Sequence, residues 1–88
     1  MYEIMKFLSL GEGRLVRIDK IVAILDAEDI KNQEFCRVAR VDGNLIDCTG
    51  GNKGRTIIIL EEGQYILSSV NDKTVYERMK KMGAFDED

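Results

Sequence analysis

A glycine-rich loop that leads directly into a β-branched run constrains this chain more than any other stretch. Residues 45–60 read LIDCTGGNKGRTIIIL. Three glycines and the basic residues Lys53 and Arg55 lie directly before the segment TIIIL. Glycine permits positive φ and lets a ligand approach the main chain, whereas β-branched residues favour a strand. The stretch therefore predicts a rigid strand over residues 56–60 that holds out a basic, anion-binding loop.

Strand signals occur on both sides of that loop. Residues 5–10 and 14–17 flank a Gly-Glu-Gly turn and predict a β-hairpin. The nearly unbroken apolar run IVAIL, residues 21–25, predicts a strand that is buried on both faces at the centre of the core. Residues 56–60 and 64–70 surround Glu-Glu-Gly and predict a second, antiparallel hairpin.

Two helices complete the predicted fold. The acidic tetrapeptide DAED caps a helix expected over residues 30–41, which Gly43 ends, and Asn71 or Asp72 caps a second helix that runs to about residue 82. The apolar stripe of the first helix is expected to contain Phe35, Val38 and Ala39. Another side of this helix carries Gln33, Arg37 and Arg40. The predicted fold class is α+β, with a small, mostly antiparallel sheet and two helices.

The composition is that of a soluble globular protein. The chain has 88 residues, of which 44% are hydrophobic and 33% charged, so residues 1–88 are expected to form a single domain. With 13 basic and 16 acidic residues the net charge is −3, and residues 84–88 are expected to form a disordered acidic tail. The first residues contain no apolar run long enough for a signal peptide or a membrane span. We therefore expect a reducing, cytoplasmic location.

Neither a metal nor a nucleotide cofactor is expected. Cys36 and Cys48 are the only cysteines and histidine is absent, so one chain cannot assemble a four-ligand zinc site. The two thiols are expected to be packing residues rather than a disulfide. The loop also fails as a nucleotide-binding motif, because Gly50 and Gly54 are too close together, arginine replaces the required lysine and a strand follows.

Catalytic groups are equally sparse. There is no histidine to act as a base, and the serines show no nucleophile-elbow pattern. Asp47 and Thr49 could form an acid–base pair, but a structural role, in which Asp47 accepts a hydrogen bond from the backbone of its own turn, is favoured. The chain is therefore expected not to be an enzyme and to have no small-molecule substrate.

Basic residues form three local clusters that could contact nucleic acid. These clusters are Arg14, Arg17 and Lys20; Arg37 and Arg40; and Lys53 and Arg55. Arginine dominates, and its planar guanidinium suits phosphate oxygens and guanine edges better than a lysine ammonium does. Basic residues scattered over an acidic protein can equally be a solvated surface. From the residues alone, nucleic-acid binding and a plain solvated surface both remain open.

Several segments together resemble the RemA family of bacterial regulators of extracellular matrix genes. They are KFLSLGEGRLV, IVAI, LIDCTGGNKGRTIII, YILSSV and TVYERM, in this order and without a gap, between about residues 5 and 82. The resemblance implies a small α+β DNA-binding protein without enzymatic activity that assembles into a closed ring of identical subunits. Double-stranded DNA would bind through basic loops repeated around the ring.

The resemblance also assigns roles to particular residues. Lys20 falls where the family places an arginine used for DNA contact, and Lys53 and Arg55 fall on the basic loop. Two loop positions depart from the family pattern, because Asn52 stands in place of an arginine and Gly54 in place of a threonine. The family also has a proline at the turn before the first helix, and this chain contains none.

Two hypotheses follow for the function. The first is a homo-oligomeric, DNA-binding transcriptional regulator that uses Lys53 and Arg55, with Arg14, Arg17 and Lys20 as supporting phosphate contacts. The alternative is a protein-interaction or scaffold module that keeps the ring but has little affinity for DNA, as the acidic total charge and the two loop departures suggest. RNA binding is disfavoured because the basic loop contains no aromatic residue on which bases could stack.

Overall fold

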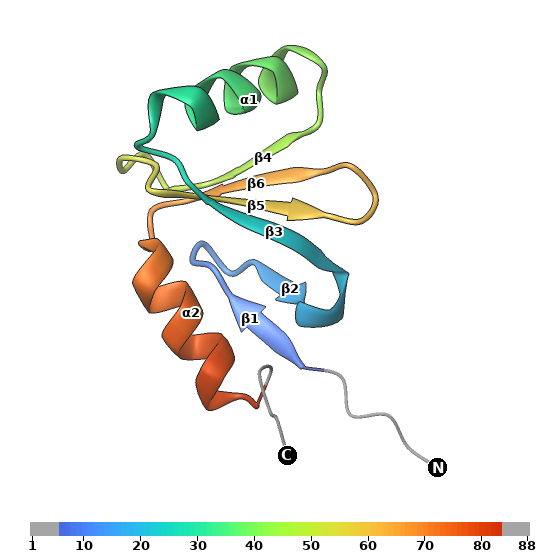
Figure 1. Ribbon diagram of the computed structural model, residues 1–88, viewed down its shortest axis with the longest axis vertical. Coiled ribbons are helices and arrows are strands. Elements are labelled where there is room, and N and C mark those ends of the chain that lie inside the picture. The colour runs from blue at the N-terminus through green and yellow to red at the C-terminus, as the bar shows by residue number, and fades with distance from the viewer. Residues whose placement is uncertain (1–5, 84–88) are drawn as a thin grey trace.

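A four-stranded sheet separates one helix from a hairpin and a second helix in the computed structural model, which describes residues 6–83 (Figure 1). The predicted start of the first strand at Met5 and the predicted tail 84–88 lie outside the described residues. The elements in chain order are β1 (Phe7–Ser9), β2 (Leu15–Arg17), the short 3-10 helix η1 (Ile18–Lys20), β3 (Ile21–Asp26), α1 (Ile30–Val41), β4 (Leu45–Cys48), β5 (Thr56–Leu60), β6 (Tyr65–Ser68) and α2 (Asp72–Lys81).

The strand order of the main sheet is β3-β5-β6-β4. The pairs β3–β5 and β5–β6 are antiparallel, whereas β4 pairs with β6 in parallel. Strands β1 and β2 form a separate antiparallel hairpin, as predicted. The α+β class, the mostly antiparallel sheet and the two helices are therefore confirmed, and the parallel β4–β6 pair is the feature that local patterns did not indicate.

Strands β5 and β6 form the centre of the sheet, and Ile57, Ile58 and Ile66 are almost completely buried. The prediction that IVAIL would be buried on both faces at the core centre is wrong, because β3 is an edge strand and Val22 is 63% exposed. An apolar run alone does not distinguish an edge strand from a central one. The β5–β6 hairpin occupies the centre of the sheet, because β5 also pairs with β3 and β6 also pairs with β4.

The core has two halves, one on each face of the sheet. The half on the hairpin and α2 side contains Leu8, Leu10, Val16, Cys48, Ile58, Ile66, Val75 and Met79. The smaller half, beneath α1, contains Ala27, Ile57 and Leu67, with Cys36 packed against it. Both cysteines are free and pack as predicted.

Helix α1 covers the sheet with a different side than predicted. Ala39 is buried, but Phe35 and Val38 from the expected apolar stripe are exposed. The small side chains of Cys36 and Ala39 lie over the sheet, and arginine stems can cover apolar surface beside them. The outer side of α1 is consequently apolar, and Ile30 and Val41 are 80% and 74% exposed.

The predicted caps and stops of the helices are confirmed. Asp29 Oδ1 accepts a hydrogen bond of 2.9 Å from the Lys31 N–H at the start of α1, and Asn71 Oδ1 accepts one of 2.8 Å from the Thr74 N–H in α2. Gly43 has a φ of 78° just after α1, where a side chain would strain the backbone. No helix within residues 6–83 is both long enough and apolar enough to cross a membrane.

Matched substitutions of two strand valines test the positions of β2 and β3. Val16 is buried and Val22 is exposed, so we expect Val16→Thr to lower the free energy of unfolding by about 1–3 kcal/mol because it places a hydroxyl in the core. Val22→Thr should change it by less than about 0.5 kcal/mol. Urea unfolding at one fixed protein concentration measures both values, and equal losses would contradict the edge position of β3.

Candidate nucleic-acid interface

The basic loop between β4 and β5 is anchored at both ends. At its start, Asp47 Oδ1 accepts hydrogen bonds from the Thr49 N–H at 2.9 Å and the Thr49 hydroxyl at 2.6 Å. At its end, the Arg55 N–H donates to the Ser68 carbonyl at 2.8 Å, and the Arg55 carbonyl accepts from the Ala27 N–H at 2.9 Å. The predicted structural role of Asp47 is confirmed, and the loop is held against two neighbouring strands.

Close packing explains one glycine of the loop. A Cβ atom on Gly54 would lie 2.6 Å from Leu67 Cδ1, which is closer than real Cβ contacts allow. Leu67 belongs to the core beneath α1, so a side chain at position 54 would force the Leu67 side chain to shift from its place in that core. The glycine that stands in place of the family's threonine thus lets the loop pack directly on β6.

Both predicted phosphate contacts in the loop bind one carboxylate. Glu28 Oε2 lies 3.1 Å from Lys53 Nζ and 3.6 Å from Arg55 Nη1. Glu28 belongs to the turn between β3 and α1, which sequence reasoning treated only as a source of capping groups. The β3–β5 pairing brings this turn beside the loop, and no local pattern could have revealed the contact.

The remaining predicted contacts lie on the β1–β2 hairpin and on the short helix η1 that leads into β3. Arg14, Arg17 and Lys20 line a groove of about 320 Å³ between the hairpin and the sheet. Arg17 pairs with Asp19 at 2.5 Å, and its hydrogen bonds lower the pKa of the Asp19 carboxyl. Lys20 lies 3.7 Å from Glu61. The five predicted residues therefore form two groups, one on the loop and one along the groove. The length of β3 separates Lys20 from the loop, whereas Arg14 follows the β1–β2 turn, which lies beside the start of the loop (Figure 1).

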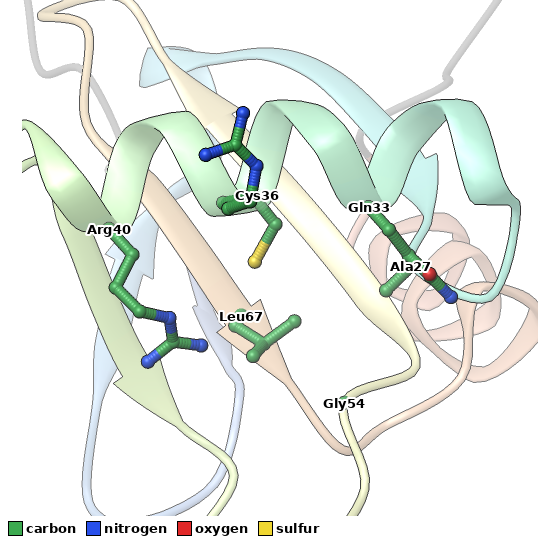
Figure 2. A pocket seen from close by; sticks show the side chains of 7 residues that line it. Ala27, Gln33, Cys36, Arg40, Gly54 and Leu67 are labelled. Carbon is green, nitrogen blue, oxygen red and sulfur yellow. The ribbon is translucent and has the colours of Figure 1, made fainter.

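Two further arginines lie near the basic loop. Arg37 and Arg40 of α1 line a cavity of about 270 Å³ together with Gln33, Cys36, Ala27, Gly54 and Leu67. Figure 2 shows Cys36 and Arg40 projecting from α1 toward the strand that carries Leu67, with Gly54 across the cavity. The predicted common side of Gln33, Arg37 and Arg40 is confirmed.

The two arginines differ in their electrostatic surroundings. Arg37 forms an ion pair with Glu34, and their hydrogen bonds raise the pKa of Arg37 and lower that of Glu34. Hydrogen bonds from Thr49 lower the pKa of Asp47, and the charge of Arg40 adds to this effect. Within residues 6–83, no group of three or more potential metal-ligating side chains is positioned to hold a metal ion.

Comparison with known proteins places this chain in a family. The family model described as "RemA-like: Extracellular matrix regulatory protein A-like" matches residues 7–79. A protein of Geobacillus kaustophilus (strain HTA426), named as a regulatory protein, is 33% identical over 84 residues, which cover 96% of this chain and 97% of the relative. A similarly named protein of Bacillus cytotoxicus is 32% identical over 75 residues, which cover 85% of this chain and 86% of the relative.

A match of this extent shows more than a shared fold class, because it covers every strand, helix α1 and all but the last two residues of helix α2. The chain belongs to the RemA-like family. The resemblance stated from the sequence is therefore confirmed.

The Asp47–Thr49 contact predicts a dependence of stability on pH. The pKa of Asp47 is lowered in the folded protein. The Asp47 carboxylate therefore contributes to the free energy of unfolding above its unfolded pKa of about 3.9, and this contribution is lost as the pH falls through its folded pKa. Thr49→Val removes the hydroxyl donor and should cost about 1 kcal/mol near pH 7. Urea unfolding should show that the difference in free energy of unfolding between the wild type and Thr49→Val becomes smaller as the pH falls toward about 3. A gap independent of pH would contradict this role of Asp47.

Proposed function

We propose that this protein is a non-enzymatic, cytoplasmic DNA-binding transcriptional regulator that acts as a closed ring of identical subunits. Membership of a family whose curated relatives are named as regulatory proteins supports the regulatory part. The observation that carries the DNA-binding part is the exposed pair Lys53 and Arg55, displayed on a loop that is anchored at both ends. Neither a cofactor nor a small-molecule substrate is part of the proposal.

The anchored loop suits phosphate contact for two physical reasons. The guanidinium of Arg55 can donate two hydrogen bonds to one phosphate, and the ammonium of Lys53 adds a second charge beside it. Because the backbone around Gly54 is already packed on Leu67, less conformational entropy is lost when DNA binds. Two charges remain a weak contact by themselves. Repetition around a ring would make the contacts act together at high effective concentration.

The second basic group supports the same function from a separate position. Arg14, Arg17 and Lys20 share one groove, and the Arg14 guanidinium makes no ion pair with residues 6–83. The length of β3 prevents Lys20 from sharing a phosphate with Lys53 and Arg55. We therefore propose that this groove provides supporting contacts that extend along the DNA backbone.

Exposed apolar side chains support self-association. One surface is the outer side of α1, with Ile30, Phe35, Val38 and Val41, and the other is the outer side of the β1–β2 hairpin, with Phe7 and Leu15. These surfaces lie on opposite sides of the main sheet (Figure 1). Two different surfaces that contact each other produce a head-to-tail interface, which closes into a ring when the rotation between subunits allows it.

A specific observation favours the alternative of a protein-interaction or scaffold module. Four of the five predicted phosphate contacts form ion pairs with Asp19, Glu28 or Glu61. These carboxylates reduce the positive potential that DNA would meet, and the whole chain has a net charge of −3. In this alternative the ring forms but duplex DNA binds poorly even at low salt.

The dependence of DNA binding on salt distinguishes the two functions. Fluorescence anisotropy with a promoter-length duplex should show affinity falling steeply between about 50 and 200 mM salt. Arg55→Ala should make the slope of log K against log salt shallower by up to about 0.9 for each contacting subunit, because one phosphate contact is lost. Lys80→Ala, on α2, removes the same charge elsewhere and is the matched control. Absence of binding at about 50 mM salt would exclude the DNA-binding function.

Mixed variants test the head-to-tail ring. Val41→Lys alters the α1 surface and Leu15→Lys the hairpin surface, and both side chains are exposed, so each variant should fold. Native mass spectrometry should show each variant alone as a monomer, because every interface needs both surfaces. A mixture should give a dimer and nothing larger, since only one intact interface can form. Retention of the wild-type mass by both variants would contradict these surfaces.

A further inference from the structure

One carboxylate oxygen lies where a phosphate oxygen would bind the basic loop. Glu28 Oε2 contacts both Lys53 Nζ, at 3.1 Å, and Arg55 Nη1, at 3.6 Å. Two cationic donors that converge on a single anionic oxygen are an arrangement that also suits a phosphate oxygen. The proposed DNA contact of the loop is therefore already occupied by an anion of the same chain.

The main chain holds Glu28 beside the loop. The neighbouring residue Ala27 is buried and donates its N–H to the Arg55 carbonyl at 2.9 Å. The Glu28 N–H donates to Asp26 Oδ1 at 2.8 Å, which fixes the turn before α1. These contacts do not involve the Glu28 side chain. Within residues 6–83, the interactions of its carboxylate are the two ion pairs, so the side chain can leave the loop without disturbing the fold.

We propose that Glu28 is an intramolecular competitor of DNA, which a phosphate group must displace from Lys53 and Arg55. The inference rests on the proposed DNA-binding function and names the residue that limits its affinity. Carboxylate and phosphate cannot share the two cations, because like charges at this separation repel each other. The Glu28 side chain is 41% exposed, so it can turn into solvent when phosphate arrives. Exposed ion pairs are weak, which makes the displacement feasible.

Competition by Glu28 has two consequences for binding. A displaced carboxylate regains its own counterion from solution, so fewer ions are released overall and the salt dependence becomes shallower. Because Glu28 weakens the attraction of each loop for phosphate, a polyanion that contacts only one loop binds poorly. A duplex that engages several loops retains the gain from effective concentration. Glu28 thereby favours DNA that contacts many subunits of a ring over short, adventitious polyanions.

Substitution of Glu28 by glutamine tests the competition. Glu28→Gln keeps the size and polarity of the side chain, and the backbone contacts of the turn remain. We expect the affinity of the Glu28→Gln protein for a promoter-length duplex to rise at least about threefold at low salt. The slope of log K against log salt should become steeper by up to about 0.9 per contacting subunit. Glu77→Gln, on α2, makes the same change in net charge and should have a much smaller effect.

A triple variant separates local competition from a general effect of charge. In a Lys53→Ala, Arg55→Ala background, Glu28→Gln should no longer tighten binding, because the cations for which it competes are absent. An equal gain in that background, or a wild-type protein that binds as tightly as Glu28→Gln, overturns the role of Glu28 and leaves the proposed function intact. If neither protein binds duplex at any salt concentration, the proposed function fails and the inference fails with it. Circular dichroism establishes that each variant is folded.

Discussion

The pairing of β5 with strands on both of its sides is the constraint on which the rest of the molecule depends. It buries Ile57 and Ile58 at the centre of the sheet and separates the two halves of the core. The same pairing continues past the strand through the hydrogen bonds of Arg55 to Ala27 and Ser68. The end of the basic loop is therefore fixed to the sheet by backbone hydrogen bonds, and the turn that carries Glu28 is brought beside it.

Most basic side chains of the predicted DNA-contacting surface are paired locally with acidic ones, on a chain whose net charge is −3. Ion pairs with acidic side chains are formed by both cations of the loop, by Arg17 and Lys20 of the groove and by Arg37 of α1. They lie at the surface, where ion pairs are weak and screened by salt. Such pairs stabilise the fold little but lower the surface potential. A protein built in this way depends on repeated contacts for affinity toward a polyanion. That need connects the exposed apolar surfaces of α1 and the hairpin with the proposed DNA contacts.

Much of the fold was predictable because its signals are local. Asp29 and Asn71 cap the helices through side-chain hydrogen bonds, and Gly43 takes the positive φ that ends α1. Two hairpins were recognisable from glycine turns between strand-forming runs. Predictions failed where local patterns were ambiguous. IVAIL is apolar enough for a central strand but lies at an edge, and α1 places Cys36 and Ala39 rather than Phe35 against the sheet.

By itself, the sequence determined the elements, the family and a loop that displays Lys53 and Arg55, because capping, turn chemistry and composition act between neighbouring residues. Only the tertiary structure decided that Lys20 lies at the far end of β3 from that loop, and that Glu28 binds both of its cations. The physical reason is that strand register sets contacts between residues distant in the chain. Register depends on the burial of the whole sheet, which no single segment encodes.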